Sequence, residues 1–252
     1  MKSILIPLPT YGFDPTEVAI PWKLLTEKNI EVVFITPNGR KASADSLMLS
    51  GDQLGIFSKA LRARTDATDA YYEMIKSDAF CRPLSYLDVY ENDYDGIILP
   101  GGHDKSVKEY LESKKLQKLI VAFFKAKKSV AAVCHGVVLV ARSIDPDTNK
   151  SVIHNYKTTA LLKSQELLAY NLTRFWLDDY YLTYPGLTVE AEVTAALVDK
   201  KNFVKGSSPL LRDDNNHLKR GFVSVDRNYI SARWPGDIYL FTLKLIDSLD
   251  KY

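Results

Sequence analysis

One stretch of the sequence decides the predicted fold: Lys128-Ser129-Val130-Ala131-Ala132-Val133-Cys134-His135-Gly136-Val137-Val138-Leu139-Val140-Ala141. An apolar run ends abruptly at Cys134, and a second apolar run follows with no loosening residue between them. The first run has the length and the small, β-branched content of a buried parallel strand. The second run fits a helix that is apolar on most sides. A strand that turns directly into a helix at one cysteine, with glycine two residues later, predicts a nucleophile elbow.

This elbow predicts a reactive role for Cys134. A tight turn strains the backbone at the nucleophile and lifts its side chain above the edge of the sheet. The sulfur then lies at a helix N-terminus, where N–H groups and the helix dipole favour a thiolate, with His135 beside it. The alternative is a small, buried, unreactive cysteine, but the pattern of strand, Cys-His-Gly and helix favours a functional site. Cys81 lies in an ordinary segment and is expected to be inert.

The composition limits the class of protein. The chain has 252 residues, of which 46% are hydrophobic and 25% charged, and this suits one domain or one domain with an insertion. With 33 basic and 31 acidic residues there is no polyelectrolyte signal, so neither nucleic acid nor membrane is an expected partner. Two cysteines make no disulfide framework, the N-terminal apolar segment is too short for a signal peptide, and no window approaches a membrane span. A cytoplasmic protein is therefore expected.

Strands and helices alternate along most of the chain. Asp14, Pro15 and Glu17 form a helix start with Asp14 as the N-cap. Strands are predicted at residues 4–8, 31–36, 96–100 and 130–133, and a late hairpin at 222–225 and 229–232. Helices are predicted from Asp14 to about residue 28 and at 107–112, 116–126, 137–142, 163–170, 173–182, 189–197 and 238–249. Residues 41–93 break the alternation and are predicted to be an inserted helical segment, with helices at 54–64 and 70–78.

This order predicts one domain over residues 1–252, an α/β three-layer sandwich around a mostly parallel sheet. Ligands bind such sheets beyond the carboxyl ends of the strands. Three loops with candidate residues lie there: residues 11–17, 101–104, and Cys134 with His135.

The loop residues have competing interpretations. Gly101 and Gly102 either present bare N–H groups as an oxyanion hole or form a tight turn that needs positive φ. His103 is expected to be a loop residue on the substrate-binding side of the site. With Asp104 it supplies too few ligands for a metal, so no metal is predicted. Glu17 is either the acid of a capping box or points at the Cys134 sulfur, where its protonated carboxyl donates a hydrogen bond to the thiolate.

With these residues in place, the chain resembles the DJ-1/PfpI superfamily, and within it the Hsp31-like branch, over nearly its whole length. The resemblance rests on Ile97-Ile98-Leu99-Pro100-Gly101-Gly102-His103, Ala131-Ala132-Val133-Cys134-His135-Gly136, Asp14-Pro15-Thr16-Glu17 and Tyr229-Ile230-Ser231-Ala232-Arg233-Trp234-Pro235-Gly236. It implies a flavodoxin-like fold in which Cys134 is the reactive thiol and His135 its partner. It also implies that Gly102 is an oxyanion donor and that Glu17 contacts the thiol.

The Hsp31-like branch orients its histidine with a downstream acid, and the resemblance implies Glu166 for that role, 32 residues after the cysteine. Asp178, Asp179 and Asp237 remain rivals. The last loop departs from the family pattern, because bulky Arg233 and Trp234 stand where many relatives carry small polar residues. Trp234 is therefore expected to border and narrow the substrate pocket.

The resemblance implies two functions. One is a cysteine-dependent enzyme acting on small carbonyl compounds, either a glutathione-independent glyoxalase that converts methylglyoxal to lactate or a related thiol hydrolase. Glutamine amidotransferase activity is disfavoured, because neither His154 nor His217 lies two residues from a glutamate. The other is a redox-responsive stress protein or holdase chaperone without turnover, in which an accessible Cys134 is oxidised. No cofactor is predicted, and a homodimer is left open.

Overall fold

The computed structural model describes residues 1–251, and its centre is a seven-stranded sheet with the order β10-β11-β7-β6-β1-β3-β5. Every pairing in this sheet is parallel except that between β10 and β11, so the predicted parallel sheet with a late hairpin is confirmed. The strands are β1 (Ser3–Pro7), β3 (Glu31–Thr36), β5 (Leu84–Ser85), β6 (Gly96–Leu99), β7 (Ser129–Val133), β10 (Val223–Asp226) and β11 (Tyr229–Ala232).

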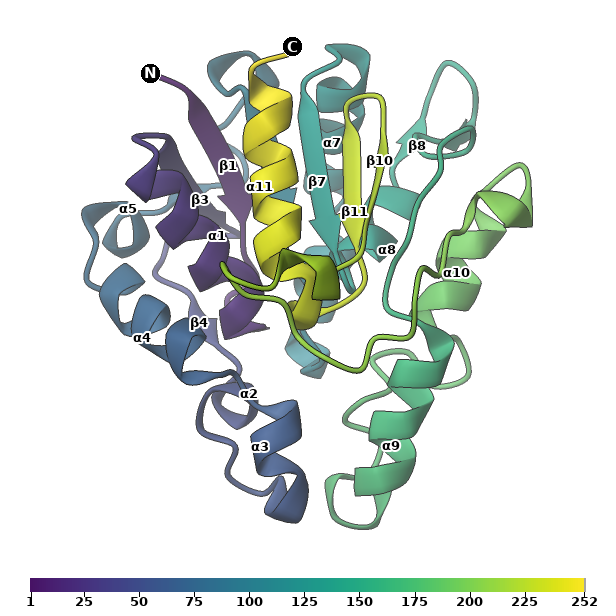
Figure 1. Ribbon diagram of the computed structural model, residues 1–252. Coiled ribbons are helices and arrows are strands. Elements are labelled where there is room, and N and C mark those ends of the chain that lie inside the picture. Colours follow the sequence, from purple (N-terminus) through teal and green to yellow (C-terminus); the bar gives the residue numbers. More distant parts are fainter. Residues whose placement is uncertain (252) are drawn as a thin grey trace.

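Helices cover both faces of the sheet. Figure 1 shows α11 in front of the sheet beside α1, with α7 behind β7, which confirms the three layers. The longer helices are α1 (Pro15–Glu27), α4 (Thr65–Met74), α7 (Lys114–Lys125), α9 (Lys163–Leu177), α10 (Val189–Ala195) and α11 (Ile238–Leu249). The shorter ones are α2 (Ser46–Ser50), α3 (Ser58–Leu61), α5 (Asp78–Cys81), α6 (Lys108–Leu111) and α8 (Gly136–Ala141).

Short elements complete the chain. Two small strand pairs lie outside the main sheet, β2 (Tyr11–Phe13) with β4 (Ser43–Ala44) and β8 (Ile144–Asp145) with β9 (Lys150–Ser151). Single 3-10 turns occur at Gly55–Phe57, Glu91–Asp93, Lys105–Val107, Lys200–Asn202, Leu218–Arg220 and Pro235–Asp237. Within residues 1–251, no helix has both the length and the apolar character that crossing a bilayer requires.

The core lies around the central strands. All residues of β1, β6 and β7 are buried, and for this reason the sequence shows continuous apolar runs there instead of alternation. Leu5, Ile97 and Val130 have no exposed surface. Burying one such side chain contributes roughly 1.5–3 kcal/mol. The central strands therefore form a rigid platform for the loops at their carboxyl ends.

The segment 41–93 differs from the predicted helical insertion. Its β5 strand adds an edge to the main sheet beside β3, and its β4 strand pairs with β2. The helix predicted at 54–64 is only a 3-10 turn followed by α3, and Gly55 has φ +54° at its start. The other predicted helix is α4, which begins at Thr65 and packs on α1.

The region after residue 162 also differs from prediction. The two helices expected at 163–170 and 173–182 are one helix, α9, which ends at Leu177. Asp178 follows with φ +46°, a conformation that stops a helix. The chain from residue 178 to 188 therefore runs as irregular backbone back toward the sheet, and Thr183 is buried in it.

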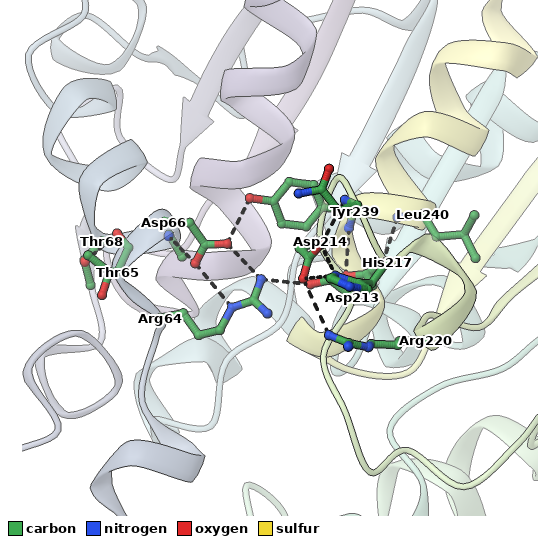
Figure 2. A network of polar contacts seen from close by, with 12 residues as sticks. Arg64, Thr65, Asp66, Thr68, Asp213, Asp214, His217, Arg220, Tyr239 and Leu240 are labelled. Atoms are coloured by element: carbon green, nitrogen blue, oxygen red, sulfur yellow. Dashed lines mark hydrogen bonds and ion pairs between the residues drawn. The ribbon is translucent and has the colours of Figure 1, made fainter.

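The segment from Asp213 to His217 has a buried end, although its run of polar residues is typical of a solvated loop. Asp213 has no exposed surface, and its carboxylate accepts the N–H groups of Tyr239 (3.3 Å) and Leu240 (2.8 Å) at the start of α11. Arg64 donates to the Asp213 carbonyl at 2.8 Å, and Asp66 accepts from the Tyr239 hydroxyl at 2.9 Å. Figure 2 shows this network, which joins α4, α11 and the chain beside residue 212. Desolvation by burial raises the pKa of Asp213 to about 7.

Candidate active site

Cys134 occupies the turn between β7 and α8, as the elbow pattern predicts. Its φ is +55°, in the left-handed region that residues other than glycine rarely adopt. Holding such a conformation costs about 1–3 kcal/mol, which the packed strand and helix must offset. Gly136 is required two residues later, because an added Cβ would lie 2.0 Å from the carbonyl oxygen of Leu99.

His135 pairs with the thiol. Its Nδ1 lies 3.4 Å from the Cys134 Sγ, and its Nε2 lies 3.0 Å from the Thr183 hydroxyl. That hydroxyl also donates to the His103 carbonyl, at 3.2 Å, so its single proton is committed there. Thr183 must then accept the Nε2–H of His135, which leaves the lone pair of Nδ1 facing the sulfur. The histidine is therefore oriented to take the thiol proton.

The surroundings of this pair do not favour the protonation state that the sequence predicts, in which Cys134 is a thiolate. Burial raises the pKa of the Cys134 thiol well above its usual value; a negative charge on Glu17 would raise it further, and the N–H of His135 opposes the rise. Burial also lowers the pKa of His135 well below its usual value. Burial therefore opposes the expected thiolate in this conformation, because it disfavours a charged sulfur more than the start of α8 stabilises one. The resting pair is a neutral thiol and a neutral imidazole.

Glu17 lies in the first turn of α1 and has no exposed surface. Asp14 alone caps that helix, accepting the N–H groups of Thr16 (2.8 Å) and Glu17 (3.1 Å). The Glu17 carboxyl instead accepts the N–H of Gly101 at 2.6 Å, so the capping-box interpretation is wrong.

The surroundings of Glu17 favour its protonated form. Burial raises the pKa of Glu17 well above its usual value, and the charge of Asp14 raises it further; hydrogen bonds with Gly101 and Cys134 oppose these effects. Glu17 is thus a protonated carboxyl beside the thiol at neutral pH.

The two glycines after β6 have different environments. The Gly101 N–H is occupied by Glu17, so Gly101 cannot also supply the expected oxyanion donor. An added Cβ on Gly101 would lie 2.7 Å from the backbone nitrogen of His135, and one on Gly102 would lie 2.3 Å from the Gly12 carbonyl oxygen. Neither glycine has positive φ, so close approach and not a turn excludes side chains. The Gly102 N–H has no hydrogen-bond partner within the described residues, and its oxyanion role stays a proposal.

Glu166 does not orient His135 as expected. It is buried on α9, and its carboxylate accepts the Val189 N–H at 3.0 Å, at the start of α10. The Nε2 of His135 is bonded to Thr183 instead. Burial raises the pKa of Glu166 to about 7. The expected Glu166–His135 contact is wrong because α9 extends over the cavity beside the elbow and directs this carboxylate at a neighbouring helix.

The rival acids lie elsewhere too. Asp237 is buried in an ion pair with Arg233 at 2.8 Å, and Asp179 forms an exposed ion pair with Lys105. Asp178 ends α9. Thr183, the group that does contact His135, was missed by sequence reasoning. No motif or periodicity surrounds Thr183, so the sequence carries no signal that could have found it.

A cavity of about 280 Å³ adjoins this centre. His103, Trp234 and Glu166 are among the residues that line it, and the predicted substrate-binding role of His103 and Trp234 stays a prediction. The His103 ring stands edge-on to the His135 ring, with 4.9 Å between centroids. Burial lowers the pKa of His103 to about 4, so this ring is neutral. The cavity therefore ends at His103, whose ring packs against His135, and Cys134 is not among its lining residues.

One group of side chains within residues 1–251 could hold a metal ion, a possibility that the sequence did not indicate. His103, Cys134 and His135 each offer one ligand atom, and these atoms all lie within 4.8 Å of one another. A thiolate and two imidazoles suit Zn²⁺ with one open position.

Known proteins share the fold and part of the sequence. A family model described as ThiJ/PfpI family-like matches residues 8–204. An uncharacterized protein of Schizosaccharomyces pombe is 30% identical over 150 residues, 56% of this chain and 54% of that protein. A glutathione-independent glyoxalase of the same yeast is 25% identical over 157 residues, 62% of each chain. The match thus spans less than two thirds of either relative.

Solved structures cover more of the chain at lower identity. Glyoxalase III from Candida albicans has a TM-score of 0.71 and 19% identity, over 98% of this chain and 97% of that one. The Rapid Encystment Protein of 24 kDa from Francisella tularensis has a TM-score of 0.70 and 17% identity, over 99% of both chains. At such identities the likeness shows the fold alone.

Proposed function

The chain belongs to the ThiJ/PfpI-like family, and on this premise we propose that it is a cysteine-dependent enzyme acting on small carbonyl compounds, of the glutathione-independent glyoxalase type. A related thiol hydrolase would use the same groups. The observation that supports this most is the pairing of a strained Cys134 with the Nδ1 of His135 at 3.4 Å. The similarity to a yeast glyoxalase and the fold of a solved glyoxalase III support the same class of reaction.

The first step joins the sulfur to the substrate. His135 Nδ1 accepts the thiol proton as Sγ attacks the aldehyde carbon of methylglyoxal, and an S–C bond forms while the C=O double bond opens. In this proposal the free Gly102 N–H and the protonated Glu17 carboxyl stabilise the developing oxyanion. Its protonation gives a hemithioacetal. Because the thiol starts neutral, proton transfer to His135 must accompany the attack.

The second step moves a proton between adjacent carbons. His135, returned to its neutral form, removes the C–H proton of the hemithioacetal carbon, and a proton is delivered to the neighbouring carbonyl carbon. This isomerisation gives a lactoyl thioester on Cys134 with no net gain or loss of atoms. Water then attacks the thioester, the S–C bond breaks, and lactate leaves with the thiol restored. The sum is methylglyoxal plus water giving lactate, with no external oxidant or reductant.

The test is lactate formation from methylglyoxal in the absence of glutathione, by wild type and by Cys134→Ser. Wild-type turnover with loss in the variant supports the proposal, and absence of lactate in both contradicts it. Of the alternative functions, a redox-responsive protein needs an accessible thiol of low pKa, whereas a holdase needs exposed apolar surface on residues 41–93 to bind unfolded clients. Cys134 is only 2% exposed, which disfavours the redox-responsive alternative. Oxidation of Cys134 by dilute peroxide without any aldehyde turnover would favour it.

A further inference from the structure

The cavity beside the thiol has an unusual set of polar groups. Buried donors in proteins almost always have a partner. Eight buried side-chain polar atoms in the described chain have none within the protein. Half of these atoms belong to residues that line this one cavity: His103 Nδ1, Tyr181 Oη, Arg212 Nη1 and Trp234 Nε1. Because the four residues border the same cavity, a ligand bound there could supply the partners that these atoms lack.

Arg212 is the charged member of this set. Its Nη2 donates to the carbonyl oxygens of Ala60 (3.0 Å) and Leu61 (3.2 Å), which fixes the guanidinium plane. Its Nη1 is buried and unpaired. Asp213, the next residue, is anchored in the network of Figure 2, so the backbone that carries Arg212 is held to α4 and α11. The guanidinium is therefore positioned in advance and keeps free N–H groups.

The other unpaired groups stand near it. The guanidinium carbon lies 5.6 Å from the centre of the Trp234 ring, which packs against Gly236, where an added Cβ would be 2.4 Å from the indole. Tyr181 is 2% exposed, and its ring lies 4.8 Å from that of His103. The series Arg212, Tyr181 and His103 thus leads from a cation toward the reactive centre.

The other residues that line the cavity limit the kind of ligand that can bind in it. Met48, Leu61, Leu168 and Leu172 make much of it apolar. The acids on the wall are already engaged, Asp14 by the N–H groups of α1 and Glu166 by that of Val189. At about 30 Å³ per water molecule, a volume of about 280 Å³ exceeds what a three-carbon dicarbonyl needs. The free donors suit an acceptor, and the planar fork of an arginine suits a carboxylate.

We propose that this cavity selects aldehyde substrates that carry a carboxylate on an apolar body, with Arg212, Trp234 and Tyr181 as specificity-determining residues. The carboxylate pairs with the Arg212 fork and the neighbouring N–H and O–H groups, and the aldehyde lies at the His103 end of the cavity, next to the thiol centre. This inference rests on the proposed function for the reaction itself. The inference adds to the proposed function the class of substrate and the residues that select this substrate.

The turnover test uses two substrates with the same reactive group, phenylglyoxal and 4-carboxyphenylglyoxal. A charge-assisted hydrogen bond of about 1.5–3 kcal/mol corresponds to roughly 10- to 100-fold in kcat/KM, so wild type should prefer the carboxylated compound by about tenfold or more. Arg212→Met should lower kcat/KM for that compound at least about tenfold more than for phenylglyoxal. Tyr181→Phe removes only an unpaired hydroxyl, so it should fold normally and reduce the preference about threefold to tenfold. The matched control is Arg220→Met, an exposed arginine 3.7 Å from Asp214, which should change neither value.

A binding test separates this inference from the proposed chemistry. The Cys134→Ala variant is titrated with 4-methylbenzoate and with the neutral 4-methylbenzamide, and binding of each compound is followed by isothermal titration calorimetry. Tighter binding of the benzoate, lost with Arg212→Met, supports the inference even if no aldehyde is turned over, in which case the proposed function alone fails. Equal binding of the two compounds, or equal turnover of the two aldehydes, overturns the inference.

Discussion

The two cysteines of this chain lie in opposite settings. Cys81 is exposed at the end of α5, where its Sγ lies 3.3 Å from the Ile75 carbonyl oxygen and 3.7 Å from the Lys41 ammonium. Cys134 is buried in a strained turn, beside a histidine and a protonated carboxyl. The first has access and a nearby positive charge; the second has a general base and oriented partners. The comparison separates ease of modification from the ability to catalyse, and the exposure of Cys81 argues against the expectation that this thiol is inert.

The largest expected effect is on turnover. Cys134→Ala removes the atom that forms the covalent intermediate, so methylglyoxal turnover should fall at least about a thousandfold. Cys81→Ala, the matched variant, should stay within about twofold, because the thiol touches none of the groups around the elbow. Lactate formation, followed by chromatography, measures both. Equal losses in the two variants would remove the distinction between the cysteines.

Labelling should show the reverse order. A bulky disulfide reagent should modify Cys81 roughly a hundredfold faster than Cys134 at neutral pH, because reaching the buried thiol requires local opening. Mass mapping of the modified peptides decides between them, with denatured protein as the control in which both react. If Cys134 reacts first, the site is open in solution and the neutral buried pair is not its resting state.

Thr183 tests whether orientation of the histidine matters. Thr183→Val keeps the shape but cannot accept the Nε2–H of His135, and losing one hydrogen bond should lower kcat about threefold to tenfold. Thr183→Ser restores the hydroxyl and should recover most of the rate. Steady-state kinetics with methylglyoxal measures this. Equal rates for the valine and serine variants would contradict a positioning role and leave Thr183 a packing residue.

The smallest change is expected at Glu17. In a Cys81→Ala background, the alkylation rate of Cys134 is followed against pH. The rate should rise with the thiolate, at a higher pH than for an exposed thiol, because burial raises the pKa of Cys134. Glu17→Gln keeps the shape of the side chain but removes the carboxyl proton that a protonated Glu17 can donate to the sulfur, so the midpoint should move to higher pH. A shift to lower pH would instead show that Glu17 is ionised where the thiol titrates, since a negative charge on Glu17 raises the pKa of Cys134.

Much of the fold could be predicted because its signals are local. The apolar runs of β1, β6 and β7 mark strands buried on both faces, and Asp14 followed by Pro15 marks the start of α1. The segment 41–93 was harder, since β5 has only two residues and exists only because it pairs with β3. Asp213 has the polar neighbours of a loop, and only its contacts with α11 bury it.

The residues of the candidate site likewise fall into two groups, those that the local sequence predicts and those that it does not. Cys134 and His135 are adjacent in the chain, so a strand-to-helix turn is enough to bring them together, and the sequence determines that turn. Thr183, Tyr181 and Arg212 come from irregular segments far along the chain, with no periodicity or motif to mark them. Glu166 had the expected spacing and helix, but helix α9 directs its carboxylate at α10. The sequence therefore determined the nucleophile, because a local turn specifies it. Only the tertiary structure decided which distant groups orient the histidine and line the cavity, because long-range packing alone sets where irregular segments lie.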